Sequence, residues 1–198
     1  REKVKSGLLG DIETAHAIYI SSGPFFHRTE AHTPNPVPEW WFNRELTGGG
    51  ALIDLGSHMI NLLRWYFGEI TDIKSYFGHR FNLDLEDNAI CFTRFESGTV
   101  GVMNFGWFSQ DYQLKVELYG TVNSAHAQNL PGNILFTAAQ MLTTGTSEFH
   151  WPHLAELQSF VKSLAHDSWP SPSGEDGLKD IEAISRAYKN QISLDYDL

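Results

Sequence analysis

The sequence predicts one α+β domain, built on a mostly antiparallel, open-faced β-sheet with helices against one face. Five segments rich in β-branched and aromatic residues have the character of strands: 11–20, 71–81, 87–96, 99–108 and 112–119. Three segments show helical periodicity instead: 51–67, 153–167 and 174–190. No linker rich in proline, glycine or serine divides the 198 residues, and 41% apolar residues suffice for a core. We therefore expect a single domain over 1–198.

Composition and charge exclude several classes of function. The formal net charge is -10, and only 14 Lys and Arg residues are spread along the chain, so no basic patch is available for nucleic acid. No stretch of about 18 apolar residues could span a membrane, and no signal-peptide core follows the N-terminus. A single cysteine, Cys91, excludes an internal disulfide. We expect a cytoplasmic protein that binds neither nucleic acid nor a membrane.

The first segments are predicted to be the end of a helix, a strand and a loop. Residues 1–9 have the character of a helix tail that ends at Gly10, without a start signal or an initiator Met, so we expect them to continue a longer protein. Residues 11–20 form the first strand, in which we expect His16 to be structural. The segment 21–47 holds four prolines and predicts a long loop, which is often functional.

The helix over 51–67 carries the candidate chemistry. Its apolar residues recur at helical intervals and can pack on a core: Leu52, Leu55, Met59, Leu62, Leu63 and Tyr66. Asp54, His58 and Asn61, spaced by four and three residues, project together from another side of the helix. Three glycines allow a tight turn before this helix, and Gly68 can end it. A histidine held by a carboxylate suits proton transfer, although a surface Asp-His pair without function has the same spacing.

The later segments complete the sheet and leave part of it uncovered. The strands 71–81, 87–96, 99–108 and 112–119 follow one another with short turns and predict a meander, in which Glu96-Ser97-Gly98 is a hairpin turn. The strand 112–119 alternates apolar with polar side chains. The strand 99–108 is apolar on both sides, as in a sheet covered on both faces. Short strands are expected over 121–149, and the last helix has Ser173 as its N-cap. Because so few helices cannot cover two faces, we expect a dimer or tetramer joined through the open sheet face.

The sequence lacks three familiar site patterns. A dinucleotide-binding turn needs Gly-x-Gly-x-x-Gly, and Gly48-Gly49-Gly50 fails because Ile53 stands three residues after the last glycine. The Asp-His pair could supply two metal ligands, but only His150 and His153 show ligand-like spacing elsewhere, and a helix start explains these two. Ser57 lacks a nucleophile-elbow pattern. We expect no metal and no nucleotide site within this chain.

The run from Gly48 to Gly68 resembles the signature of a known family. It reads Gly-Gly-Gly-x-Leu-x-Asp-x-Gly-Ser-His and ends in Leu-Leu-Arg-Trp-x-x-Gly, as in the substrate domain of the glucose-fructose oxidoreductase and inositol dehydrogenase (Gfo/Idh/MocA) family. Four other segments resemble the family in the same order: 6–12, 38–43, 95–99 and 173–178. One position departs: the family often has Asp where this chain has Asn61, whose amide can bind a hydroxyl but cannot take its proton.

The resemblance implies the substrate-binding and oligomerisation domain of an NAD(P)-dependent oxidoreductase acting on a sugar, polyol or related hydroxyl compound. It implies that His58 transfers the proton and that Asp54 binds substrate and tunes the histidine, together with a lysine from a preceding domain. That N-terminal dinucleotide-binding domain would bind NAD or NADP, and the open sheet face would make the subunit contacts. Further candidates for substrate binding are Asn61, Trp41, Phe42 and Arg44, although the aromatics could instead fill a gap under the loop.

Two alternatives to a dehydrogenase stay open. A non-enzymatic ligand-binding or assembly domain of the same fold would keep the Asp-His pair for structure. Some relatives with this layout use the cofactor for redox-assisted elimination or hydrolysis.

Overall fold

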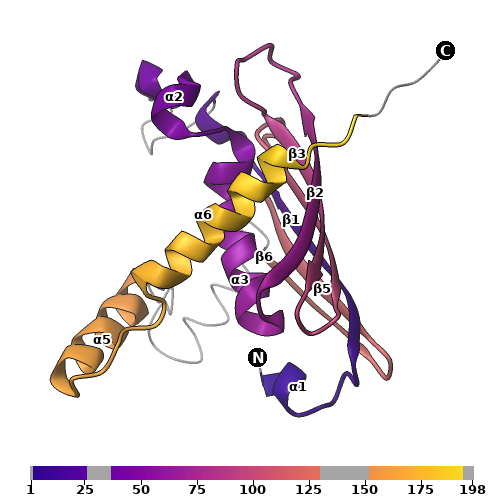
Figure 1. Cartoon of the computed structure of the whole chain (residues 1–198), viewed down its shortest axis with the longest axis vertical. Coiled ribbons are helices and arrows are strands. Elements are labelled where there is room, and N and C mark those ends of the chain that lie inside the picture. Colours follow the sequence, from indigo (N-terminus) through magenta and orange to yellow (C-terminus); the bar gives the residue numbers. More distant parts are fainter. Residues whose placement is uncertain (1, 26–36, 130–151, 194–198) are drawn as a thin grey trace, which may run out of the picture. The chain divides into compact units, whose positions relative to one another are not determined.

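The computed structural model describes residues 2–25, 37–129 and 152–193. The chain divides into two compact units, one of residues 1–129 and 179–198 and one of residues 130–178, and each is described by itself. The first unit contains the sheet and the candidate site (Figure 1). No helix in these described ranges is long and apolar enough to cross a bilayer. The single domain over 1–198 stays a prediction.

Six strands form one sheet in the first unit. They are β1 (Ile12–Ile20), β2 (Ile70–Gly78), β3 (Asn88–Phe95), β4 (Val100–Gly106), β5 (Gln113–Gly120) and β6 (Ser124–Asn129). Their order across the sheet is β2-β3-β4-β1-β5-β6. β1 pairs with β4 in parallel, and the other four neighbouring pairs are antiparallel. The predicted α+β class with a mostly antiparallel sheet is confirmed.

The expected succession of four strands is wrong at one point, because β1 lies between β4 and β5. Thr14 of β1 pairs with Val100 of β4 on one side and with Tyr119 of β5 on the other. Alternation of apolar and polar residues indicates which face each side chain takes, but it carries no information on which strand lies alongside. The first strand of the chain therefore lies between two strands that are consecutive in the sequence.

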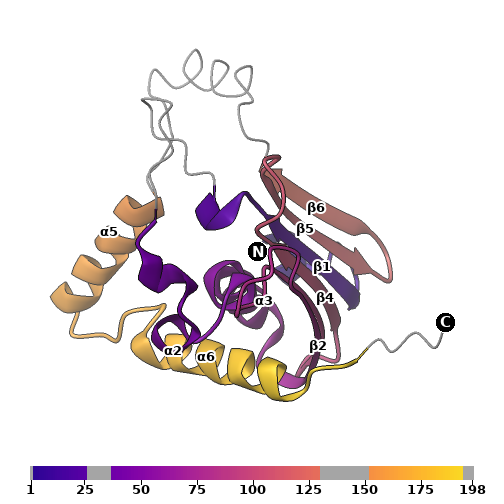
Figure 2. The ribbon, with the colours of Figure 1, turned by 90° about the horizontal axis from the view of Figure 1, so that it is seen from above.

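Helices cover one face of the sheet. α3 (Ser57–Phe67) and α6 (Gly174–Lys189), from residue 179 onward, lie on the same side of it (Figure 2). The core between them is formed by residues such as Ile60, Leu63, Ala89, Met103, Phe105 and Ile184. Each large apolar side chain buried there stabilises the fold by about 1.5–3 kcal/mol.

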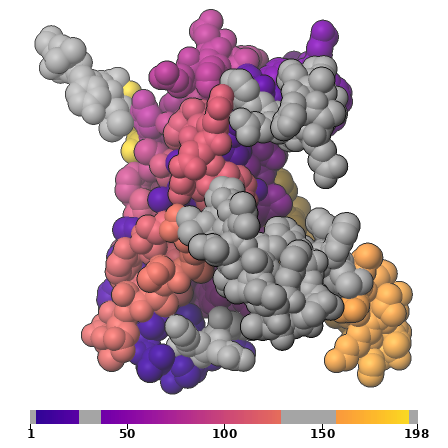
Figure 3. Space-filling model, turned by 180° about the vertical axis from the view of Figure 1, so that it is seen from behind, coloured from indigo at the N-terminus to yellow at the C-terminus, as the bar shows by residue number. Residues whose placement is uncertain are grey.

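The opposite face of the sheet carries exposed aromatic side chains. Phe92 and Tyr119 on this face are 47% and 40% exposed. The space-filling view from behind shows β5 and β6 at the surface (Figure 3). Among the residues that the structure describes, helices therefore cover one face of this sheet and leave the other face open, as the sequence predicts.

The predicted site helix exists, but its first turn is wider than an α-helix. One π-helical turn, η3 (Leu52–Gly56), leads into α3. A Cβ on Gly56 would lie 2.7 Å from the Leu52 side chain and 3.1 Å from the Phe105 ring, so glycine lets this turn approach the sheet. Gly68 ends the helix at φ 82°, and its N–H donates to the Arg64 carbonyl at 2.9 Å. Single π-turns inside helices are frequent at functional sites.

The remaining elements are short or belong to the second unit. The first helix, α1 (Glu2–Lys5), is shorter than predicted. The described part of the predicted loop contains two 3-10 turns, η1 (Gly23–Phe25) and η2 (Glu39–Phe42), and one helical turn, α2 (Arg44–Thr47). α5 (Pro152–Ala165) lies in the second unit. Ser173 caps α6 as predicted, because its hydroxyl accepts from Asp176 N–H at 3.3 Å. The strands expected over 130–149 lie outside the described residues.

Candidate functional site

The glycines before the site helix are required by close contacts. A Cβ on Gly49 would lie 1.9 Å from the hydroxyl of Tyr188, and a Cβ on Gly50 would lie 2.0 Å from the carbonyl oxygen of Glu86. Both glycines are buried. The space that a larger side chain would need is occupied by protein, so these glycines serve the entry into the helix and offer no cradle for a pyrophosphate.

Glu86 receives the first amides of this helix. Its Oε1 accepts hydrogen bonds from the N–H groups of Gly50 and Leu52 at 2.9 and 3.0 Å, and its main-chain oxygen accepts from Ala51 at 2.9 Å. No sequence pattern indicates this role, because Glu86 lies in a loop 36 residues further along the chain than Gly50. A carboxylate at a helix start also interacts favourably with the helix dipole.

A hollow of about 280 Å³ opens beside the start of the helix. Its described lining residues are Trp40, Trp41, Leu46, Thr47, Gly49, Gly50, Ile53, Asp54 and Trp107. Asp54 is the only ionisable side chain in this lining. A small concave site with aromatic walls and a few polar groups, one of them charged, is typical of ligand pockets, although this one is at their lower size limit of about 300 Å³.

Trp107 holds the Asp54 carboxylate. Its indole Nε1 donates to Asp54 Oδ2 at 2.9 Å, and the side chain is only 2% exposed. The Trp107 N–H donates to the carbonyl of Asp87 at 2.9 Å, next to Glu86 in the chain. Trp107 belongs to the predicted strand 99–108, and no sequence pattern indicates this contact.

His58 and Asp54 are brought near the same tyrosine. The exposed His58 ring lies 6.1 Å from the Tyr19 ring, centre to centre, and Tyr112 lies 5.7 Å from Tyr19 on another side. Burial, a hydrogen bond with Tyr112 and the negative charge of Asp54 raise the pKa of Tyr19. Tyr19 is therefore a protonated hydroxyl at neutral pH that lies near both predicted catalytic residues.

The other predicted site residues have different neighbours. Trp41 joins Asp54 in the hollow, whereas Phe42 packs on Phe25 at 5.8 Å between ring centres. Arg44 lies over the ring of Tyr188, 5.4 Å from its centre. These contacts place two of the three loop candidates outside the lining of the hollow.

Asn61 turns towards α6. Its amide donates to Asp180 Oδ2 at 2.7 Å, and the same carboxylate forms an ion pair with Arg64. Asn61 thus shares the helix with Asp54 and His58 but contacts a different element. Its role in substrate binding stays a prediction.

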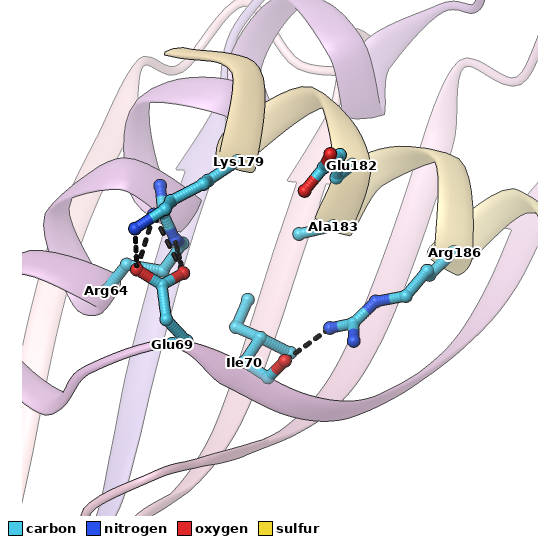
Figure 4. Close-up of a pocket in the computed structure, with 7 residues that line it drawn as sticks. All are labelled: Arg64, Glu69, Ile70, Lys179, Glu182, Ala183 and Arg186. Carbon is cyan, nitrogen blue, oxygen red and sulfur yellow. Dashed lines mark hydrogen bonds and ion pairs between the residues drawn. The ribbon is translucent and has the colours of Figure 1, made fainter. Parts of the chain in front are cut away.

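A second hollow, of about 270 Å³, is lined by charged groups that bind each other (Figure 4). Glu69 accepts hydrogen bonds from Arg64 at 2.9 Å and Lys179 at 3.1 Å, and Arg186 donates to the carbonyl of Ile70. Burial opposes the charge of Glu69, but the bonds from Lys179 and Arg64 outweigh it and lower the pKa of that carboxyl. These groups connect α6 with α3 and β2, which is a structural role.

The described residues contain no group of three or more His, Cys, Asp or Glu side chains that could hold a metal ion. The predicted His150 and His153 pair lies outside the side chains that the structure describes.

A family model for the GFO/IDH/MocA C-terminal domain matches residues 1–126. Among curated proteins, the D-glucoside 3-dehydrogenase of Escherichia coli K12 is 27% identical over 214 aligned positions, which cover 96% of this chain and 57% of that protein. The chain therefore spans little more than half the length of this relative.

Solved structures share the fold. The WlbA dehydrogenase from Bordetella pertussis in complex with NADH and UDP-GlcNAcA has a TM-score of 0.72 at 17% identity, covering 96% of this chain and 57% of that chain. A myo-inositol dehydrogenase from Corynebacterium glutamicum has a TM-score of 0.71 at 16% identity, covering 98% and 60%. Because the family model matches well over half of the sequence, the chain belongs to the GFO/IDH/MocA family and corresponds to its C-terminal domain.

Proposed function

We propose that this chain is the substrate-binding and oligomerisation domain of an NAD(P)-dependent oxidoreductase that acts on a sugar, polyol or related hydroxyl compound. The observation that carries the proposal is the Asp54 carboxylate at an aromatic hollow, with His58 one turn further along the same helix. The names of the relatives, a glucoside dehydrogenase and a myo-inositol dehydrogenase, support the substrate class.

In this proposal His58 takes the proton of the substrate hydroxyl. An imidazole nitrogen can accept such a proton, and because His58 is exposed it can pass the proton on to solvent. Asp54, oriented by the Trp107 indole, binds a substrate hydroxyl. Tyr19 can donate a further hydrogen bond to the substrate, and Trp40 and Trp41 offer apolar surface to the face of a sugar ring.

The nicotinamide cofactor would accept the hydride, and a preceding domain would bind it. Gly49 and Gly50 do not leave room for a pyrophosphate, because Tyr188 and Glu86 occupy the space beside them. Two fold relatives were crystallised with NAD or NADH, and each is much longer than this chain. Calorimetric titration of the 198-residue chain with NAD and NADP should therefore show no saturable binding.

The open sheet face supports assembly into a dimer or tetramer. Phe92 lies near the middle of this face and is 47% exposed. Burying such side chains against a second copy would remove apolar surface from water. Phe92→Glu in the full-length protein should shift its sedimentation towards the monomer, and a wild-type monomer at micromolar concentration would contradict the proposal.

A screen of the full-length protein tests the function. Formation of NADH or NADPH is followed at 340 nm with methyl glucoside, levoglucosan and myo-inositol, each with both cofactors. We expect turnover of at least one compound and its loss in His58→Ala. The rival, a non-enzymatic ligand-binding domain, predicts binding of such a compound by calorimetry without any reduction of the cofactor.

A further inference from the structure

The start of the site helix is held by a buried carboxylate from another part of the fold. Glu86 is 1% exposed, and its Oε1 accepts from Gly50 N–H, from Leu52 N–H and from the Tyr188 hydroxyl, the last at 2.7 Å. Three donors on one oxygen fix the carboxylate in position, while Oε2 is buried without a partner among the described residues. Asp54 follows Leu52 by two residues, within the same π-turn.

A capping side chain just before the helix would accept hydrogen bonds from these N–H groups without burying a carboxylate. Ser, Asn or Asp just before a helix usually accepts its first N–H groups from solvent-exposed positions. A buried carboxylate with one unsatisfied oxygen lowers stability, so its presence calls for a function beyond capping. What Glu86 adds is a connection between three elements, because Tyr188 belongs to α6 and Asp87 receives the N–H of Trp107.

The loop that contains Glu86 and Asp87 therefore positions both members of the hydrogen bond between Trp107 and Asp54. Glu86 holds the helix turn that carries the carboxylate, and the Asp87 carbonyl holds the backbone of the indole that donates to it. Tyr188 locks Glu86 from the opposite side, and burial together with the Glu86 charge raises the pKa of its hydroxyl, so that it remains a donor. A change in this loop would move the turn and the indole together.

From this geometry we infer that Glu86 and Tyr188 are positioning residues for the substrate site, and that they act through the turn that carries Asp54. The inference rests on the proposed function for the role of Asp54. It predicts that loss of the Tyr188 hydroxyl weakens catalysis without removing any group that contacts the substrate. It also predicts that this loss loosens the turn itself, whether or not the substrate is known.

The experiment uses the full-length protein with Tyr188→Phe, which keeps the ring under Arg44 and removes only the hydroxyl. Glu86→Gln is the second variant, and Tyr76→Phe, on the opposite side of the sheet, is the matched control. Hydrogen exchange measured by mass spectrometry compares peptides that cover 50–56 with peptides from β3. One hydrogen bond to a charged group corresponds to roughly a tenfold or larger change in local opening, so we expect exchange in 50–56 to rise by about that factor in Tyr188→Phe. The control should leave it unchanged.

The kinetic arm uses whichever of methyl glucoside, levoglucosan or myo-inositol the wild type oxidises. We expect kcat/KM to fall roughly tenfold in Tyr188→Phe. When Tyr188→Phe is added to a protein that already carries Asp54→Asn, kcat/KM should change little, because Tyr188 acts through Asp54. Unchanged exchange at 50–56, or an equal loss of kcat/KM in both backgrounds, would overturn the inference. If the wild type oxidises none of the three, the proposed function fails for them, while the exchange measurement still decides the positioning role.

Discussion

Replacing Gly50 by Ala should unfold or strongly destabilise the site, although the change adds one methyl group. The new Cβ would lie 2.0 Å from the Glu86 carbonyl oxygen and 3.1 Å from the Leu85 Cβ, and both neighbours are buried. Relieving the overlap must displace the Glu86 loop or the helix start. Overpacking of a close-packed interior costs about 1–3 kcal/mol. Loss of one hydrogen bond from Gly50 or Leu52 to the Glu86 carboxylate adds about 1.5–3 kcal/mol.

The expected destabilisation is therefore about 2.5–6 kcal/mol, a large part of the stability of an ordinary domain. Urea unfolding of the full-length protein, followed by far-UV circular dichroism, measures it. Gly177→Ala is the matched control, because nothing lies within 4 Å of a Cβ at this helical position. That variant should gain about 0.4–1 kcal/mol. Equal stability of Gly50→Ala and wild type would refute the interpretation of the glycines as close-contact residues.

Three other expectations follow from the buried polar groups. Burial raises the pKa of the Cys91 thiol to about 12, so a thiol reagent at pH 8 should label it only after unfolding, as counted by mass spectrometry. Burial and the Glu86 charge raise the pKa of Tyr188, so the folded state keeps a proton that the unfolded chain loses above about pH 10. This proton contributes stability below about pH 10, and that contribution should be lost as the pH rises further. The resulting fall in Tm should be smaller in Tyr188→Phe. Trp107→Phe should reduce kcat/KM about tenfold in the wild-type background. The same substitution should reduce kcat/KM by a smaller factor in a protein that already carries Asp54→Asn.

Local features of the fold were predictable because neighbouring residues determine them. The first strand, the helix that ends at Gly68 and the Ser173 cap follow from side-chain periodicity and from glycine and serine chemistry. The strand 99–108, apolar on both sides, and the small number of helices also predicted an uncovered face, which is the face that carries Phe92. These inferences use residues no more than a few positions apart.

Features that depend on distant segments were not predictable. The position of β1 between β4 and β5 depends on which strand edges meet, and alternation is the same for any partner. Glu86 binds Leu52, which lies 34 residues earlier in the chain, and Trp107 binds Asp54, which lies 53 residues earlier. The π-turn likewise depends on the approach of Gly56 to Phe105 of the sheet. Helical spacing predicted that Asp54 and His58 share a helix, but no pattern indicated that Trp107 binds Asp54 or that Tyr19 lies beside His58.

The most direct test of the account is His58→Ala in the full-length protein, with kcat and Tm measured on one preparation. If His58 transfers the substrate proton, kcat should fall by roughly 10²- to 10⁴-fold. Because the His58 side chain is exposed, the free energy of unfolding should change by less than about 0.5 kcal/mol and Tm should stay almost constant. Full turnover per folded molecule, together with a lowered Tm, would contradict the catalytic assignment and favour a structural role for the Asp54 and His58 pair.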